Sequence, residues 1–356
     1  MTASGEYFPL PEDEGGWRYA ASDAEVRDLA GLDPEVLALE DREQQRHYGG
    51  DSWAISVVRN GVLAAEFRTF NLGDSTRFDV WSATKSFTSL AFGIIFSDPE
   101  YTGKISLQSR AYDFIPEGHP LTDERKKDIT IGHLLSMTSG FIGGEHGASG
   151  TPTRTGEGLF EFAIGRIPNR YGYDASRLIA DPGTQWEYSD PGYAHLSLVF
   201  SHVTGQEIDT FMNERMFQPI GIPRVSWTRS GGGLNLGPHT VPHTGLVLSA
   251  REFARCGYLL LRGGKWAGRQ LVSQEWIETV THPSQSFNPQ YGYGFWVNTT
   301  GTLWPDVPTD AFAMMGYRGS RCWVVPSLDL VIARTGSGPA VIDDRYFPQR
   351  IIGALI

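Results

Sequence analysis

The sequence predicts an α+β fold in which helices flank an antiparallel sheet built from both ends of the chain. Residues 55–59 and 62–67 have the composition of strands, and Asn60 and Gly61 between them are typical of a type I′ hairpin turn. Towards the C-terminus, β-branched and aromatic residues are enriched in four further segments of strand length, at 295–300, 311–315, 321–326 and 328–334.

The middle of the chain has the signals of helices. Apolar residues at helical spacing occur at 129–137, 193–204 and 208–217, and a further helix is expected over 249–262. Asp33 followed by Pro34 marks another helix start, because Asp caps and Pro suits the first turn.

This order of elements predicts two domains. Residues 1–100 and 245–356 are expected to form the sheet domain, and residues 101–244 an inserted, mostly helical domain. Ligand clefts commonly form where two such units meet, so the active site is expected at their junction.

Charge and composition exclude several classes of protein. The chain has 30 basic and 41 acidic side chains, a net charge of −11, and no basic block, which argues against nucleic acid or anionic membranes as partners. No apolar run reaches the roughly 20 residues of a membrane span, and no signal peptide is recognisable at the start. With only two cysteines, Cys256 and Cys322, a cytoplasmic location is expected.

A serine and a lysine three residues apart provide the first candidate chemistry. Ser82 and Lys85 share a face if this segment is helical, so the hydroxyl and the amine can meet. Serine needs a neighbouring base to become a nucleophile, and a lysine can be that base where burial lowers its pKa. The apolar neighbours Val80, Trp81 and Phe87 favour burial, although the spacing alone also fits a capping serine beside a solvated lysine.

Two later segments complete the candidate site. Tyr188 lies in a turn-rich loop before a buried helix, where its phenol can serve as a second acid or base near a cationic lysine, or simply be a half-buried structural group. Residues 316–320, rich in glycine, precede a strand. A backbone N–H there can form half of an oxyanion hole, with the N–H of Ser82 as the other half.

In order and spacing, these three segments resemble the serine β-lactamase and penicillin-binding-protein superfamily, closest in style to class C β-lactamases and their esterase relatives. Those proteins carry Ser-x-x-Lys, then Tyr-x-Asn, then Lys-Thr-Gly or His-x-Gly. The resemblance spans roughly residues 50 to 340 and includes the segments 129–140, 291–296 and 324–333.

The resemblance implies a role for each matching residue. Ser82 would be the acylated nucleophile, Lys85 the general base and Tyr188 a proton carrier. The N–H groups of Ser82 and Ser320 would form the oxyanion hole. Whether the lysine or the tyrosine takes the first proton stays open.

The sequence departs from the family pattern at two positions. Asp190 replaces the usual Asn. Its negative charge near Lys85 would raise the pKa of the lysine and so oppose its use as a base. Alternatively, Asp190 recognises a donor or a cation on the substrate. Tyr317 replaces the usual Lys or His, so a substrate carboxylate would need Arg318 or Arg321 instead. We expect substrate contacts from Tyr317, Arg318 and Gly319. The two departures, at Asp190 and Tyr317, argue against antibiotic and cell-wall substrates.

The function expected is that of an intracellular serine acyl hydrolase, most simply a carboxylesterase of small esters. It would need no metal and no cofactor. The alternatives are an amidase or D-amino-peptide hydrolase and an acyltransferase, for which the loop at 140–158 could shape an acceptor site. A more distant alternative is a catalytically silent ligand-binding protein. The sequence does not indicate an oligomeric state.

Overall fold

A seven-stranded sheet forms the centre of the fold. The computed structural model describes residues 6–143, 158–167, 176–231, 236–336 and 345–356. The strand order is β1-β3-β2-β13-β12-β11-β10, and every neighbouring pair is antiparallel except β1 and β3. The strands are β1 (Arg18–Tyr19), β2 (Trp53–Arg59), β3 (Val62–Arg68), β10 (Trp296–Val297), β11 (Phe312–Met315), β12 (Arg321–Val325) and β13 (Leu330–Gly336). The predicted fold class is confirmed.

The two ends of the chain meet in the middle of this sheet. Strand β2 pairs with β3 on one side and with β13 on the other, from Trp53 opposite Gly336 to Arg59 opposite Leu330. Asn60 and Gly61 join β2 to β3 with φ angles of 53° and 72°, as a type I′ turn requires. The predicted hairpin is therefore confirmed, with a bulge between Val57 and Val58 that the sequence did not indicate.

Helices cover both faces of the sheet. Helix α8 (Ala250–Leu261) packs on β2, β12 and β13, while α2 (Pro34–Tyr48) and α10 (Phe347–Ile352) pack together on the opposite face. Side chains of β13 alternate between the two cores: Val331 and Ala333 point towards α8, and Leu330 and Ile332 towards α2 and α10. Asp33 accepts a hydrogen bond from Glu35 N at 3.0 Å, so the predicted cap of α2 is confirmed.

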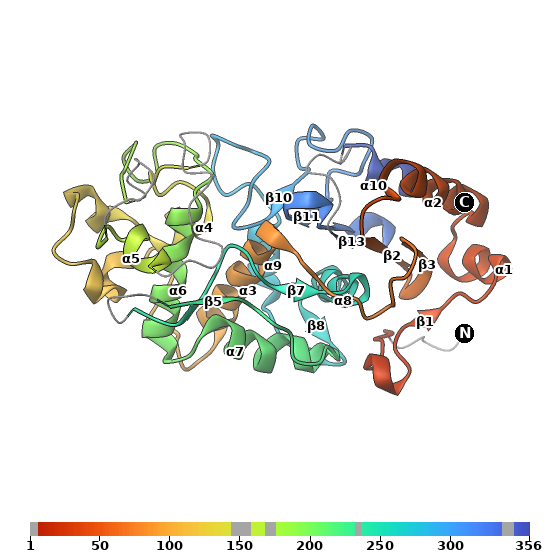
Figure 1. Cartoon of the computed structure of the whole chain (residues 1–356), viewed down its shortest axis with the longest axis horizontal. Coiled ribbons are helices and arrows are strands. Elements are labelled where there is room, and N and C mark those ends of the chain that lie inside the picture. The colour runs from red at the N-terminus through yellow and green to blue at the C-terminus, as the bar shows by residue number, and fades with distance from the viewer. Residues whose placement is uncertain (1–5, 144–157, 168–175, 232–235, 337–344) are drawn as a thin grey trace.

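The middle of the chain supplies helices of five to fifteen residues and several tight turns. In Figure 1 this part, yellow to green, occupies one end of the molecule, and the red and blue chain ends lie together at the other. The division into domains at residues 100 and 244 stays a prediction. The remaining α-helices are α1 (Asp23–Glu25), α3 (Thr84–Ser97), α4 (Ile131–Leu135), α5 (Leu159–Ala163), α6 (Asp190–Thr204), α7 (Ile208–Met212) and α9 (Gln274–Val280). Short paired strands are β4 (Phe78–Asp79) with β7 (Val247–Leu248), β5 (Arg229–Ser230) with β6 (His239–Thr240), and β8 (Lys265–Trp266) with β9 (Arg269–Gln270).

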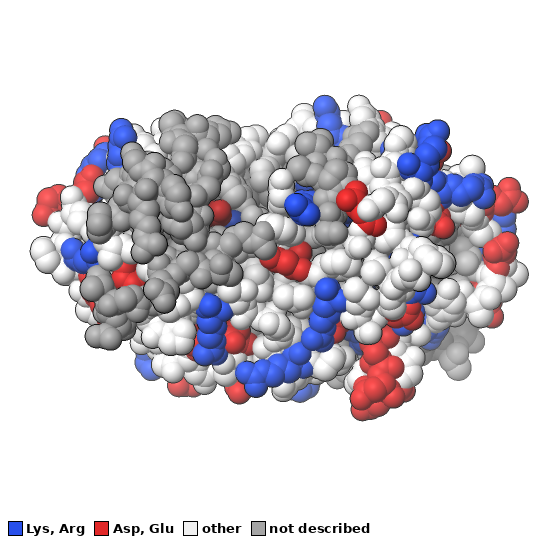
Figure 2. Space-filling model, viewed as in Figure 1, with Lys and Arg blue, Asp and Glu red and all other residues white. Residues whose placement is uncertain are grey.

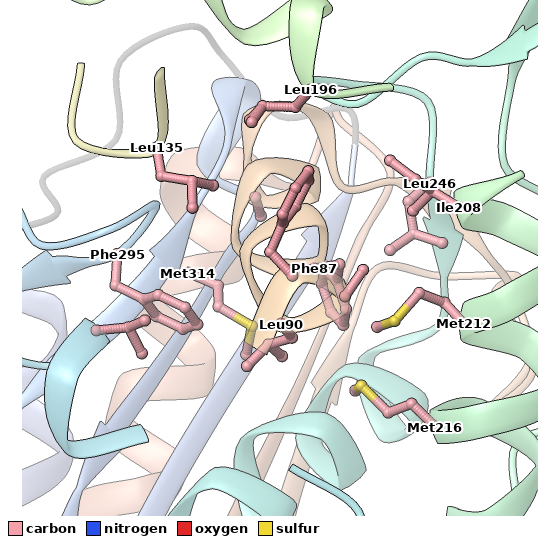
Figure 3. Packing of buried hydrophobic residues seen from close by; sticks show 14 of the residues in the cluster. Phe87, Leu90, Leu135, Leu196, Ile208, Met212, Met216, Leu246, Phe295 and Met314 are labelled. Carbon is pink, nitrogen blue, oxygen red and sulfur yellow. The ribbon is translucent and has the colours of Figure 1, made fainter. Parts of the chain in front are cut away.

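Helix α3 passes through the largest core. Its residues from Thr84 to Ile95 are all buried. Figure 3 shows Phe87 and Leu90 of this helix surrounded by side chains from the helices, the sheet and the loops, among them Leu135, Leu196, Met212, Leu246 and Met314. A helix buried on all sides is held in one position, and so are the groups at its start.

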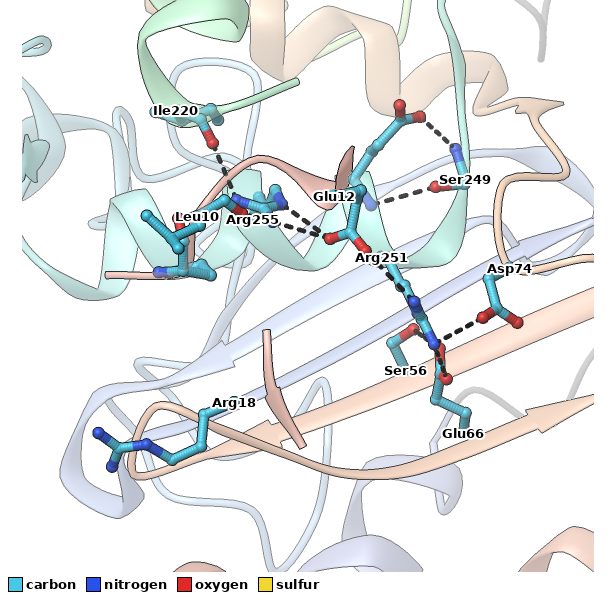
Figure 4. Close-up of polar contacts among 12 residues, drawn as sticks. Leu10, Glu12, Arg18, Ser56, Glu66, Asp74, Ile220, Ser249, Arg251 and Arg255 are labelled. Atoms are coloured by element: carbon cyan, nitrogen blue, oxygen red, sulfur yellow. Dashed lines mark hydrogen bonds and ion pairs between the residues drawn. The ribbon is translucent and has the colours of Figure 1, made fainter. Parts of the chain in front are cut away.

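Arg255 of α8 binds the first residues of the described chain. Arg255 is fully buried; its guanidinium donates to the carbonyl oxygens of Pro9, Leu10 and Ile220 and forms an ion pair with Glu12 at 2.8 Å (Figure 4). A buried guanidinium needs such partners because its five N–H donors would otherwise be unsatisfied. Arg255 thereby fixes the path of the chain before β1.

The described surface carries both charge signs side by side. On the face seen in Figure 2, lysine and arginine side chains are interspersed with aspartate and glutamate. None of the helices in the described ranges is long and apolar enough to cross a bilayer.

The packing of α3 predicts that Gly93→Ala destabilises the protein. A Cβ atom on Gly93 would lie 1.9 Å from Cδ1 of Trp276, a ring fixed by its Nε1–H donating to Ser89 O at 3.0 Å. We expect a loss of roughly 1–3 kcal/mol in the free energy of unfolding, measured by urea denaturation. Gly50→Ala is the matched control, since a Cβ there meets nothing within 4 Å. Equal stability of the two variants would contradict this packing.

Candidate active site

Ser82 lies in a 3-10 turn, Trp81–Ala83, directly before α3. The sequence analysis considered residues 82–85 as one helical segment, whereas the α-helix begins at Thr84. Asp79 Oδ1 accepts a hydrogen bond from Trp81 N at 2.7 Å, and Trp81 has a φ of 54°, in the left-handed region that non-glycine residues rarely adopt. Strained residues of this kind cluster at functional sites, where the surrounding structure holds them in place.

Lys85 reaches back from the first turn of α3 to Ser82. Its side chain is 1% exposed, and its Nζ lies 3.1 Å from Ser82 Oγ, 3.2 Å from His243 O and 2.7 Å from Asp190 Oδ1. The predicted meeting of serine and lysine is present in the structure. Because a buried ammonium is stable only when paired, Asp190 is the partner that allows this lysine to be charged.

Burial and charge pull the pKa of Lys85 in opposite directions. Burial, the largest single influence, favours the neutral amine, but the Asp190 carboxylate and the nearby Tyr188 together outweigh it, so the pKa of Lys85 is raised. For Asp190, burial opposes ionisation, and Lys85 and His243 overcome it, so that its pKa is lowered. The resting site therefore holds an ammonium–carboxylate pair.

Tyr188 and Asp190 come from one anchored loop. Ser189, between them, is buried; its Oγ accepts from Gly192 N at 3.0 Å, capping α6, and donates to Ile142 O at 2.8 Å. The side chains on either side of Ser189 both turn to Lys85, whose Nζ lies 4.7 Å from the centre of the Tyr188 ring. The structure thus brings Ser82, Lys85, Tyr188 and Asp190 together.

The third predicted segment borders the nucleophile turn. A Cβ on Gly316 would lie 2.0 Å from Val80 O, so only glycine permits this approach of the strand end to the turn that bears Ser82. Next to it, the half-exposed Tyr317 ring lies 5.3 Å from the Trp81 ring, and the Arg318 guanidinium lies 5.9 Å from each of these two rings. Arg318 also has a left-handed φ of 55°.

Gly319 and Ser320 lie deeper in the protein than expected for substrate contacts. Both residues are buried. The Ser320 N–H donates to Tyr317 O at 3.3 Å within its own turn, and its hydroxyl donates to Asp79 O at 3.4 Å. The Ser320 N–H thus already has an acceptor, which the expected oxyanion role did not take into account.

Sequence reasoning gave no role to His243. The side chain is buried, its Nδ1 has no hydrogen-bond partner among the described residues, and burial lowers the pKa of His243 to about 4. Its contact with Lys85 is made by the backbone carbonyl, which no residue pattern reveals. Of the two histidines of α6, His195 is buried and hydrogen-bonded to Tyr112 and Pro191 O, and His202 is exposed.

The loop proposed as an acceptor site, at 140–158, lies mostly outside the described residues. Within it the structure describes 140–143 and residue 158 alone.

With this geometry in view, comparison with known proteins identifies the family. The sequence model of the family described as Beta-lactamase matches residues 38–346. The chain belongs to this family. It is therefore a serine hydrolase of the esterase, amidase or peptidase type, with the β-lactamase and transpeptidase fold.

Individual relatives are distant. A protein of Escherichia coli (strain K12) with the provisional name D-alanyl-D-alanine carboxypeptidase is 22% identical over 357 residues. The match covers 86% of this chain and 79% of that protein. The crystal structure of a family VIII carboxylesterase has a TM-score of 0.66 at 18% identity, over 95% of this chain and 98% of that one. EstCE1, described as a hydrolase with promiscuous acyltransferase activity, has a TM-score of 0.68 at 16% identity, over 90% of this chain and 98% of that one.

The ion pair at Lys85 predicts a pH-dependent stability defect in Asp190→Asn. Without the carboxylate, burial dominates and lowers the pKa of Lys85, so the folded protein binds fewer protons than the unfolded one and gains stability as pH rises. We expect Asp190→Asn to cost roughly 1–3 kcal/mol at neutral pH, less than for a fully buried pair because the Asp190 side chain is 40% exposed.

Thermal unfolding between pH 7 and pH 9.5 measures this effect. The deficit in Tm relative to the wild type should narrow as pH rises. Asp181→Asn, which removes an exposed carboxylate from the same loop, serves as the control and should show a constant, small difference. A deficit for Asp190→Asn that does not change with pH would refute the proposed pairing.

Proposed function

We propose that this chain is a carboxylesterase of small esters that forms an acyl-enzyme at Ser82, with Lys85 as general base. The observation that carries the proposal is the 3.1 Å contact between Lys85 Nζ and Ser82 Oγ inside an otherwise buried environment. A hydroxyl this close to an amine can transfer its proton as it attacks a carbonyl.

The reaction takes two stages. Lys85 first releases its resting proton to solvent. Ser82 Oγ then bonds to the carbonyl carbon while its proton passes to the neutral Lys85 amine, and the tetrahedral intermediate expels the alcohol, which takes up that proton through Tyr188. A water molecule next attacks the acyl-enzyme and gives up a proton by the same route. The carboxylic acid leaves, and the proton returns to Ser82 Oγ. No group is consumed, and the net change is addition of water to the ester.

For the oxyanion hole, we propose the N–H groups of Ser82 and Met315. Gly316 N donates to Ser320 O at 2.7 Å, so the N–H of Gly316 points towards β12. Because successive N–H groups of a strand point to opposite edges, the N–H of Met315 points to the other edge of β11. On that edge β10 pairs only as far as Trp296, opposite Ala313. Met315 N–H therefore points past the end of β10, beside the turn that carries Ser82, and takes the role expected of Ser320.

The rim formed by Trp81, Tyr317 and Arg318 offers aromatic surface and one guanidinium to a substrate. Arg318 supplies the positive charge that Tyr317 cannot, and Arg321 Nη1 donates to Ser320 O at 3.0 Å. We propose that the rim contacts the part of the substrate outside the reacting carbonyl.

Two other reactions use the same acyl-enzyme. The name of the Escherichia coli relative supports a peptide or amide substrate, for which an amine replaces the alcohol as leaving group. EstCE1 supports acyl transfer, in which an alcohol replaces water in the second stage. A silent ligand-binding protein is disfavoured because the buried Lys85 is held at hydrogen-bond distance from Ser82.

The proposed roles predict that Ser82→Ala and Lys85→Ala each lower kcat/KM for p-nitrophenyl butyrate by at least about a thousandfold. Ser97→Ala is the matched control, since it removes a hydroxyl at the far end of the same helix, where Ser97 donates only to Gly93 and Ile94 carbonyls. It should keep wild-type activity.

Intact-mass measurement with a slowly hydrolysed ester should show one acyl group on the wild type and none on Ser82→Ala. Turnover that persists in Ser82→Ala would overturn the proposal.

A further inference from the structure

One oxygen of Asp190 is turned into the protein and the other is left outside. Oδ1 is buried against Lys85 Nζ at 2.7 Å, whereas the side chain as a whole is 40% exposed, compared with 1% for Lys85. The exposed part of the carboxylate is therefore the side away from Lys85. A negative group open to the surroundings lies next to the nucleophile.

The distance from this carboxylate to the reacting atoms is short. Oδ1 forms an ion pair with Lys85 Nζ at 2.7 Å, and Ser82 Oγ accepts a hydrogen bond from the same nitrogen at 3.1 Å, so both oxygens lie beside one atom. A substrate whose carbonyl carbon is in contact with Ser82 Oγ has room for two or three bonds between that carbon and a group bound to Asp190. An amino group at the α or β position of the acyl part meets this requirement.

The other groups around Lys85 supply no competing charge. Tyr188 and Tyr193 present their rings 4.7 and 5.8 Å from Nζ, and burial, reinforced by Tyr188, holds the pKa of Tyr193 well above its usual value, so its phenol stays neutral. His243, with its low pKa, is neutral at physiological pH as well. Among the described residues that contact Lys85, Asp190 is thus the anion, and its outer oxygen is the natural acceptor for a cation.

We infer that the acyl part of the substrate carries an ammonium group, at the α or β carbon, which binds the outer oxygen of Asp190. This inference rests on the proposed function, because it takes Ser82 as the nucleophile. It narrows the substrates from small esters in general to aminoacyl esters, or aminoacyl amides if the leaving group is an amine.

A bound ammonium would also change Lys85. It shares the carboxylate with Lys85 and repels the lysine charge, and both effects lower the pKa of Lys85, while burial, which favours the neutral amine, remains. Lys85 then releases its proton to solvent on substrate binding and becomes the free amine that general-base catalysis needs. An ammonium-bearing substrate would thus raise kcat as well as lower KM, whereas an uncharged one meets a lysine that is still protonated.

Two isosteric esters test the inference. The benzyl esters of β-alanine and butyric acid differ in one terminal group, an ammonium in place of a methyl, and release of benzyl alcohol measures both reactions. At about pH 7, where the amine is protonated, we expect the wild type to favour the β-alanine ester at least tenfold in kcat/KM, with part of the difference in kcat.

Asp190→Asn should remove the preference, and Asp181→Asn, the control, should retain it. The pH profile adds a readout that a purely structural role would not move. In the wild type, the rise of kcat/KM with pH should occur at lower pH for the β-alanine ester than for the butyrate ester. In Asp190→Asn the two esters should rise together, at lower pH than the wild type with butyrate.

Each outcome separates the two proposals. Ser82-dependent hydrolysis of both esters at equal rates, or a preference that survives in Asp190→Asn, would overturn the ammonium inference and leave the esterase proposal intact. Absence of Ser82-dependent turnover with either ester would overturn both.

Discussion

The arrangement of this site depends on one constraint, which is that the ammonium group of Lys85 is buried and must be paired. The pairing draws on three separate parts of the chain: the first turn of α3, the start of α6 at Asp190, and the loop carbonyl of His243. None of these partners lies near another in sequence. The pairing of one lysine therefore links the start of α6 and the loop at His243 to the first turn of α3, next to the turn that carries Ser82.

The backbone around Ser82 is constrained by contacts of its own. Ser82 sits between Trp81, whose left-handed φ is held by Asp79, and α3, which is buried from its first residue. Gly316 closes the other side because its missing side chain lets the end of β11 approach Val80 O. With the serine and lysine fixed in this way, little reorganisation is needed when a carbonyl enters, which is how preorganised sites lower a barrier.

Local sequence signals predicted those features that depend on neighbouring residues. The Asn60-Gly61 turn, the Asp33 cap and the Ser82–Lys85 pair each rest on residues at most three apart, and each is present in the structure. The turn-rich loop made Tyr188 a candidate, and the resemblance to a family gave Tyr188 its role and drew attention to Asp190. No local pattern indicates that these two residues meet Lys85.

Other features depend on where distant segments end, and these were missed. Strand β10 pairs with β11 only at Phe312 and Ala313, so the Met315 end of β11 lies beyond this pairing, and the role of His243 follows from a backbone carbonyl that any residue would provide. The parallel pairing of β1 has no signal in a strand of two residues.

The position of β13 at the centre of the sheet has a consequence for how the protein is made. During synthesis the β2–β3 hairpin leaves the ribosome early, but the edge of β2 has no partner until residues 330–336 follow, near the end of the chain. Until then, an unpaired strand edge and the apolar surface of α3 are exposed together, a combination that favours aggregation. A prematurely terminated chain that lacks β13 would thus be a target for chaperones and proteases rather than a partly active enzyme, even though it contains Ser82, Lys85, Tyr188 and Asp190.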